Sequence, residues 1–239
     1  NNVYSGRDKT AFVNHSQLIA DERKRSDQLL GSILPASLVP RVQSGETNIS
    51  LAVQTVSVLF SDIVEFTPWC GSNTATYVMK TLNRIFMEMD ALVNSHKTLT
   101  RVKCIGDSYM AAGGIFDEIN NPTVHAKEMV EFGIEAINKM KELNGIFNEN
   151  LRIRVGINTG GPIVAGVLGV DKPTFEILGP TINIAQQMEQ NGVPMMVHIS
   201  RSVYELVYGF FDIKERGEID VKKGKMLTYL VSPDSRPKA

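Results

Sequence analysis

Apolar residues along the chain follow two different spacings, which separate predicted strands from predicted helices. Residues 55–62 form an almost continuous apolar run that ends on Asp62, and such a run predicts a buried strand. Residues 72–96 instead carry apolar side chains every three or four positions, which predicts a long amphipathic helix. Those side chains are Val78, Leu82, Ile85, Met89 and Leu92.

The same two spacings continue to the end of the chain and alternate between strands and helices. They predict a hairpin over 99–105 and 108–115 around Gly106-Asp107, a helix over 121–147, a hairpin over 151–158 and 163–168 turned by Gly160-Gly161-Pro162, helices over 179–191 and 200–207, and strands over 210–219 and 226–231. We therefore predict an α+β fold.

The first of these elements run strand, helix, strand, strand, helix, strand, which is the βαββαβ order of a ferredoxin-like core. A right-handed crossover places the third strand between the first two and antiparallel to both. Asp62 ends the first strand and Asp107 precedes the third, so we expect these two side chains to lie together. Additional αβ segments and the C-terminal strands extend the core.

Residues 1–34 predict a helix that ends near Pro35. A frayed linker helix and a short parallel coiled coil both remain open, because polar residues interrupt the apolar stripe. We expect residues 1–50 to be a helical signalling linker and residues 51–239 to be the globular domain. The chain begins without methionine, so we expect a piece of a longer protein with an upstream membrane or sensor module.

Composition removes several classes of function. The 239 residues carry 25 basic and 26 acidic side chains, so the chain lacks the excess of positive charge that is typical of nucleic-acid-binding proteins. Cys70 and Cys104 are the only cysteines, which is typical of a reducing compartment, so a cytoplasmic domain is expected. No apolar run reaches the roughly 18 residues of a membrane span.

Two neighbouring carboxylates have three interpretations. They can be turn and cap residues, an acid–base dyad, or ligands of metal ions. Two such groups repel each other unless a proton or a cation lies between them. Hard cations such as Mg²⁺ or Mn²⁺ prefer oxygen ligands and often share them with a phosphate, so a two-metal site fits Asp62 and Asp107 best.

Several blocks of the sequence, in order, resemble the catalytic domains of class III adenylyl and guanylyl cyclases. They are "VLFSDIVEFT", "RVKCIGDSYM", "RVGINTGGPIVAGVLG", "EILGPTINIAQQME" and "RGEIDVKKGKMLTY", and "LLGSILPASLV" is similar to the signalling linker that precedes such domains. The resemblance covers residues 29–231. It implies a nucleoside triphosphate bound in a head-to-tail dimer, where the ribose 3′-hydroxyl attacks the α-phosphate and pyrophosphate leaves.

The resemblance also assigns roles by motif. Asp62, Asp107 and the backbone carbonyl of Ile63 would hold two Mg²⁺ or Mn²⁺ ions per site, one acidifying the 3′-hydroxyl and one neutralising the polyphosphate. Lys223 matches the lysine that contacts the β- and γ-phosphates. The alternative for Lys223 is a charge in a solvated basic turn.

Lys103 and Glu176 stand at the positions that read the base. Lysine can only donate, which suits adenine N1, and a carboxylate can accept from the adenine amine. Guanine would present a donor to Lys103 and an acceptor to Glu176. The resemblance therefore implies an adenylyl-type domain that binds ATP, although guanylyl-type members, which typically carry Glu at the position of Lys103, share other blocks.

The transition-state residues are incomplete. Asn183 matches the family's asparagine, but Gln187 stands where the family has an arginine one helical turn later. Losing a donor of this kind typically costs ~10²–10³ in rate. Arg84, Lys172 or a partner chain could supply the missing positive charge.

Two further positions depart from the family. Gly161 stands where some members carry another arginine, in what resembles a one-residue insertion. Glu65 replaces the usual glycine of "DIVGFT", and it is either a surface charge, which we favour, or a third metal ligand.

Two hypotheses follow. The first is an adenylyl cyclase that makes 3′,5′-cyclic AMP for intracellular signal transduction as a homodimer with composite sites. One copy would give Asp62 and Asp107, and the other would give Lys103, Glu176, Asn183, Gln187 and Lys223. The second is a weak or inactive regulatory domain that binds nucleotide and forms a heterodimer with a related cyclase.

Overall fold

The computed structural model describes residues 5–222 and 224–235, with side chains from residue 15 onward. Lys223, predicted to contact phosphate, lies outside the described residues. The described parts of residues 1–49 and 167–175 form one compact unit, and those of residues 50–166 and 176–239 form a second.

The first unit contains the predicted N-terminal helix. Helix α1 (Ser5–Ile33) is followed by the short helix α2 (Val39–Gln43). The backbone N–H of Val167 donates to the carbonyl of Ile49 at 3.0 Å and joins the two segments of this unit. Of the helices in the described part of the chain, none has the length and apolar character needed to cross a bilayer.

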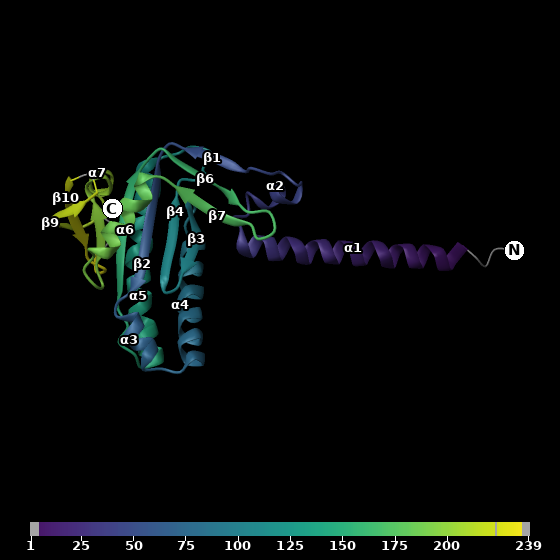
Figure 1. Ribbon diagram of the computed structural model, residues 1–239, viewed down its shortest axis with the longest axis horizontal. Helices are drawn as coiled ribbons and strands as arrows, with labels where there is room; N and C mark the ends of the chain where they lie inside the picture. Colours follow the sequence, from purple (N-terminus) through teal and green to yellow (C-terminus); the bar gives the residue numbers. More distant parts are fainter. Residues whose placement is uncertain (1–4, 223, 236–239) are drawn as a thin grey trace. The chain divides into compact units, whose positions relative to one another are not determined.

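The second unit is built on a seven-stranded sheet with the order β3-β4-β2-β5-β8-β10-β9. Figure 1 shows β2, β4 and β3 side by side in this sheet. Its strands are β2 (Val56–Ile63), β3 (Leu99–Ile105), β4 (Ser108–Gly113), β5 (Ile153–Gly160), β8 (Val197–Ser200), β9 (Ile213–Val221) and β10 (Gly224–Val231). The helices are α3 (Phe66–Gly71), α4 (Ala75–Ser95), α5 (Pro122–Phe147), α6 (Pro180–Gln190) and α7 (Arg201–Val207).

The predicted ferredoxin-like core is confirmed. Strand β4 lies between β3 and β2 and is antiparallel to both, with Ser61 opposite Tyr109 and Ile105 opposite Ser108. This register brings the end of β2 beside the turn between β3 and β4. The topology thus provides the edge on which the two aspartates were expected to meet.

The predicted hairpin over 151–158 and 163–168 is wrong. Strand β6 (Ile163–Leu168) leaves β5 and pairs with β1 (Ser50–Val53) in a three-stranded sheet β1-β6-β7, where β7 is Thr174–Leu178. The cause lies at Gly161, where a Cβ would be only 2.0 Å from the carbonyl oxygen of Gln54. The chain therefore passes tightly against Gln54 and turns into a second sheet.

The two faces of β5 have different partners, and this difference positions the site. Val155 faces helix α5, because a Cβ on Gly133 of α5 would contact its side chain at 3.3 Å. Gly156 faces α6, and a Cβ there would lie 1.9 Å from the backbone nitrogen of Glu189. Side chains alternate along a strand, so Arg154 also faces α6. Asp62 lies directly opposite Arg154 in β2 and shares this face.

Two histidines are fully buried in this unit. His125 contacts the Ser57 hydroxyl through Nδ1 at 2.7 Å, and His198 contacts the carbonyl of Met188 through Nδ1 at 2.6 Å. Burial is the main reason that the pKa of each falls from 6.5 to about 4. Each ring therefore stabilises the fold as neutral imidazole above pH 6.5, and that stability is lost as pH falls toward 4.

We expect His198→Asn to remove one of these acid-sensitive contributions. At pH 5 an unfolded histidine is protonated and the buried one is not, which corresponds to about 2 kcal/mol. The gap in unfolding free energy between the wild type and His198→Asn should therefore shrink by about 2 kcal/mol between pH 7.5 and pH 5. Urea denaturation at both pH values measures this gap, and a gap that is the same at both would contradict the prediction.

His96→Gln is the matched control, because its titration has the opposite sign. The hydrogen bond that His96 donates to the Glu135 carboxylate raises the pKa of His96, so its contribution is present below pH 6.5 and is lost as pH rises through the raised value. Removing His96 should widen the gap to the wild type on acidification. Measuring differences from the wild type also cancels the carboxyl groups that titrate in every variant.

Candidate active site

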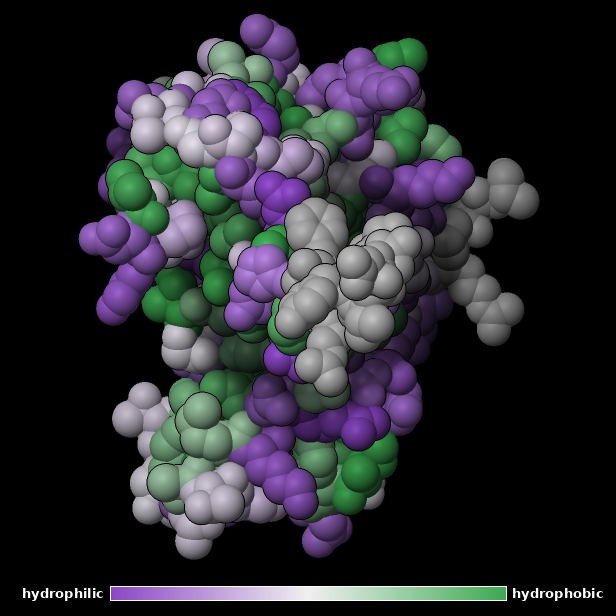
Figure 2. Space-filling model, turned by 90° about the vertical axis from the view of Figure 1, so that its right-hand side faces the viewer, coloured by the Kyte–Doolittle hydropathy of each residue, from purple (hydrophilic) through white to green (hydrophobic). Residues whose placement is uncertain are grey.

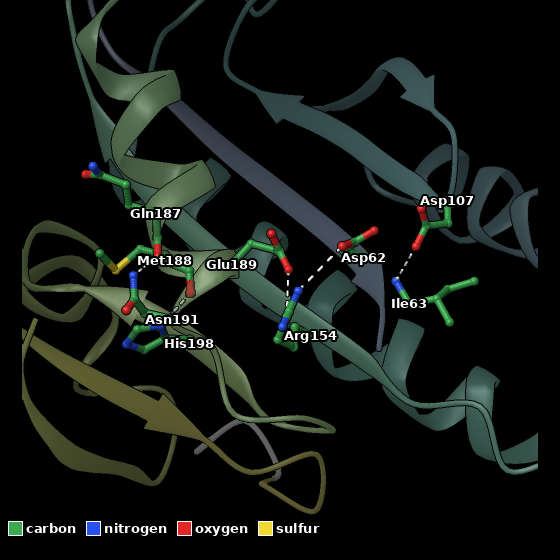
Figure 3. Close-up of polar contacts among 9 residues, drawn as sticks. All are labelled: Asp62, Ile63, Asp107, Arg154, Gln187, Met188, Glu189, Asn191 and His198. Atoms are coloured by element: carbon green, nitrogen blue, oxygen red, sulfur yellow. Dashed lines mark hydrogen bonds and ion pairs between the residues drawn. The ribbon is translucent and has the colours of Figure 1, made fainter. Parts of the chain in front are cut away.

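Asp62 and Asp107 meet where they were expected to meet. Asp62 is the penultimate residue of β2, and Asp107 follows Gly106 in the turn between β3 and β4. The positive φ of 60° at Gly106 permits the tight turn. The backbone N–H of Ile63 donates to Asp107 Oδ2 at 3.3 Å, which holds the Asp107 carboxylate at the end of β2 (Figure 3).

The electrostatics of this pair favour a cation. Burial is the largest of the effects that raise the pKa of Asp62 to about 7, followed by the neighbouring Asp107 carboxyl and by Glu189. A divalent cation would stabilise both charged carboxylates, and hard oxygen ligands suit Mg²⁺ or Mn²⁺. Within the described residues no cluster of three or more His, Cys, Asp or Glu is arranged to hold a metal. Two carboxylates, a backbone carbonyl and substrate phosphates make a donor set that fits these ions.

The sequence reasoning missed two charged residues at this site. Arg154 Nη2 lies 3.5 Å from Asp62 Oδ2, and Arg154 Nε donates to Glu189 Oε1 at 2.9 Å. Glu189, in α6, is only 5% exposed. The available signals were Arg154 between apolar residues of the predicted strand 151–158 and Glu189 as the one charged residue of the predicted helix 179–191. Arg154 partly offsets the raised pKa of Asp62.

The two predicted base-reading residues lie together. Lys103 Nζ on β3 donates to Glu176 Oε2 on β7 at 2.6 Å, and both side chains remain partly exposed. A donor and an acceptor are thus presented side by side, as the hydrogen-bonding edge of a purine base would require.

The predicted transition-state residues lie on the outer side of α6. Asn183 is exposed and Gln187 is partly exposed, one helical turn apart. The Gln187 side chain points away from Asp62 and Arg154 (Figure 3). A single chain therefore brings together Asp62, Ile63 and Asp107, and brings together Lys103 and Glu176, while Gln187 faces elsewhere. The opposite side of α6 is buried and consists of Thr181, Ala185, Met188 and Glu189.

The structure also shows the surroundings of the positions that depart from the family pattern, and of the residues proposed to supply the missing positive charge. Glu65 adopts a left-handed conformation at φ 56°, and its carboxylate is 76% exposed and 3.5 Å from Arg152 Nη2. This exposure is consistent with a surface charge. At position 161 the close approach of Gln54 leaves no room for an arginine side chain. Arg84 pairs with Glu88 on α4 at 2.8 Å, and Lys172 belongs to the other unit.

Comparisons with known proteins identify the family of the chain. A family model for the adenylate and guanylate cyclase catalytic domain matches residues 50–233. Atrial natriuretic peptide receptor 2 of Anguilla japonica is 32% identical over 231 residues, which are 95% of this chain and 22% of the receptor. The chain spans about a fifth to a third of the length of the curated relatives that it matches.

Solved structures with the same fold include both a guanylyl cyclase and an adenylyl cyclase. The catalytic core of a rhodopsin-guanylyl cyclase with converted specificity, in complex with ATPαS, has a TM-score of 0.71 and 35% identity, covering 78% of this chain and 99% of that one. The adenylyl cyclase CyaB of P. aeruginosa has a TM-score of 0.70 and 26% identity, covering 76% of this chain and 95% of that one. The chain belongs to the adenylate and guanylate cyclase catalytic domain family.

Proposed function

We propose that this chain converts ATP to 3′,5′-cyclic AMP and pyrophosphate. The observation that carries the proposal is the meeting of Asp62 and Asp107 at the end of β2, beside a hydrogen-bonded Ile63 backbone. Residues 51–239 would be the catalytic domain and residues 1–50 the signalling linker. In a longer protein we place the domain on the cytoplasmic side of a membrane, after a membrane or sensor module, and its product would serve intracellular signalling.

The chemistry follows from the side chains that surround the reacting groups. Asp62, Asp107 and the Ile63 carbonyl would hold two Mg²⁺ or Mn²⁺ ions, which acidify the ribose 3′-hydroxyl and offset the charge of the polyphosphate. Asn183 would donate to the α-phosphate as its charge develops. Lys223 would contact the β- and γ-phosphates.

A homodimer with composite sites would complete this arrangement. Within one chain Gln187 points away from the two aspartates, so a second copy is needed to bring its side chain to the nucleotide. Large apolar side chains are exposed on β3, β6 and β7, at Ile105, Val164 and Leu178. Figure 2 shows hydrophobic patches among hydrophilic side chains on the face that it presents. Exposed apolar surface of this kind is typical of an interaction face.

The choice of ATP rests on Lys103 and Glu176. The lysine would donate to adenine N1, and the carboxylate would accept from the exocyclic amine. Guanine would leave both groups mispaired, at a cost on the order of 1–3 kcal/mol for each. Several curated relatives are named guanylate cyclases, and the related core that holds ATPαS carries a converted specificity, so one fold accommodates both bases.

The double variant Lys103→Glu/Glu176→Lys tests the choice of base. It keeps the ion pair and the net charge but exchanges donor and acceptor, which matches guanine O6 and N1–H. We expect the ratio of kcat/KM for ATP to kcat/KM for GTP to fall by roughly a hundredfold or more. Steady-state assays with each nucleotide and Mn²⁺ measure this ratio.

The matched control for this test is Lys139→Glu/Glu142→Lys, which exchanges an ion pair of 2.7 Å on α5. It should leave the ratio unchanged. A wild type that prefers GTP, or a Lys103→Glu/Glu176→Lys variant with an unchanged ratio, would show that Lys103 and Glu176 do not select adenine.

A regulatory domain is the second candidate, and Gln187 favours it. A neutral amide cannot supply the charged, forked contact that an arginine gives to phosphate. Such a domain would bind nucleotide and form a heterodimer with a competent cyclase without appreciable turnover of its own. Restoring the arginine separates the two candidates.

A further inference from the structure

One guanidinium at the candidate site is shared between two carboxylates from different elements. Arg154 uses Nε for Glu189 Oε1 at 2.9 Å and Nη2 for Asp62 Oδ2 at 3.5 Å (Figure 3). Charge-assisted hydrogen bonds are usually about 2.7–2.9 Å long. Glu189 therefore holds Arg154 closely, and Asp62 receives only its weaker contact.

Glu189 is held firmly in this position by the packing of α6. The helix backbone lies directly on Gly156, where a Cβ would be 1.9 Å from the Glu189 nitrogen. At the start of α6 the Asn158 amide donates to the Thr181 carbonyl at 3.0 Å. Near its end the Met188 carbonyl is 2.6 Å from His198 Nδ1. Glu189 is thus a fixed, buried group rather than a mobile surface group; burial raises its pKa, and the Arg154 guanidinium opposes that shift and favours the charged form.

We propose that Glu189 is a positioning residue that sets the cation affinity of Asp62 by holding Arg154 away from it. The proposal rests on the proposed function, in which Asp62 and Asp107 bind divalent cations. With Glu189 charged, Arg154 partly neutralises Asp62 but leaves its carboxylate available to a cation. Without that charge, Arg154 moves fully onto Asp62, and an incoming cation must displace a complete ion pair.

The test measures binding of Mn²⁺ alone, by the loss of its free electron paramagnetic resonance signal. Glu189→Gln keeps the shape of the side chain and removes its charge, so we expect Mn²⁺ to bind roughly fivefold more weakly, the equivalent of one lost hydrogen bond. The double variant Arg154→Gln/Glu189→Gln also removes the competing guanidinium. It should bind Mn²⁺ at least as tightly as the wild type.

Restoration by the second substitution, together with the stability of each variant, distinguishes positioning from a structural role. If Glu189 merely stabilised the fold, the loss of Mn²⁺ binding in Glu189→Gln would come with a lower free energy of unfolding, which urea denaturation of each variant measures; positioning weakens Mn²⁺ binding by a protein that is fully folded. The double variant also carries the test if Glu189→Gln alone fails to fold, because it removes the guanidinium that Glu189→Gln leaves without its closest partner. Glu205→Gln, which breaks an exposed ion pair of 2.8 Å with Arg201, is the matched control and should bind Mn²⁺ as the wild type does.

Failure of this inference can be told apart from failure of the proposed function by Asp107→Ala. If Asp107→Ala binds Mn²⁺ as the wild type does, the aspartates are not cation ligands and the proposed function is overturned. If Asp107→Ala loses binding while Glu189→Gln retains wild-type affinity, only the role of Glu189 is overturned. Weaker binding by Glu189→Gln together with restoration in the double variant supports it.

Discussion

Replacing Asp107 with alanine is expected to lower the rate of cyclisation by about a thousandfold and to leave the fold intact. The carboxylate lies in the turn between β3 and β4, and its described contact is the Ile63 N–H at 3.3 Å. Its removal takes away half of the carboxylate charge that would hold the cations. It also removes the neighbouring carboxyl that, after burial, contributes most to raising the pKa of Asp62. We therefore expect unchanged or slightly greater thermal stability together with loss of turnover.

Production of cyclic AMP from ATP with Mg²⁺ and with Mn²⁺ measures this effect, and thermal unfolding verifies the fold. Asp234→Ala, which removes an exposed aspartate near the end of the described chain, is the matched control and should retain wild-type activity. Equal rates for the wild type and Asp107→Ala would show that the measured activity does not come from this site. A loss of rate accompanied by unfolding would contradict the stability argument.

Local patterns are sufficient to predict the cation-binding half of this site. The apolar run that ends on Asp62 specifies β2, and Gly106-Asp107 specifies the turn before β4. The right-handed crossover then requires the two to be adjacent. The strand and the turn are each specified within a few residues, and the crossover rule needs only the order of the elements, which explains why the meeting of the two aspartates could be predicted without a structure.

Arg154 and Glu189 show where local patterns are insufficient. They meet because α6 lies on β5, and that contact depends on Gly156 having no side chain. Periodicity predicts a strand and a helix there but not their close approach. The wrongly predicted hairpin after β5 has the same origin, since the approach of Gly161 to Gln54 is a contact between distant segments.

The Lys103–Glu176 ion pair could be predicted from the sequence only in part. The residues are 73 positions apart, and Glu176 lies on β7, a five-residue strand that the apolar pattern does not predict. Motif resemblance names both residues as base readers, but it does not say that they contact each other. The structure adds that contact. Because the two side chains form an ion pair, the exchange Lys103→Glu/Glu176→Lys swaps donor and acceptor without leaving either charge unpaired.

Replacing Gln187 with arginine is expected to raise kcat by roughly a hundredfold if the chain is an enzyme that lacks one transition-state donor. Arginine offers a charged fork to the developing phosphate charge, whereas glutamine offers one neutral amide. The backbone should tolerate the change, because the Gln187 carbonyl remains bonded to the Asn191 backbone N–H at 3.1 Å and to the Asn191 amide at 2.9 Å. The side chain is partly exposed and points away from the crowded Glu189 side of α6.

Gln186→Arg provides the matched control, because it adds the same charge to the same helix about 100° further round its axis. It is exposed and should leave the rate unchanged. If kcat rises in Gln187→Arg but not in Gln186→Arg, the gain comes from an arginine at position 187 that faces the nucleotide. Extra positive charge on α6 would have raised kcat in both variants. If neither the wild type nor Gln187→Arg turns over ATP while both bind it, the arginine was not the only missing element. The chain would then be a regulatory partner whose catalytic donors come from a different cyclase.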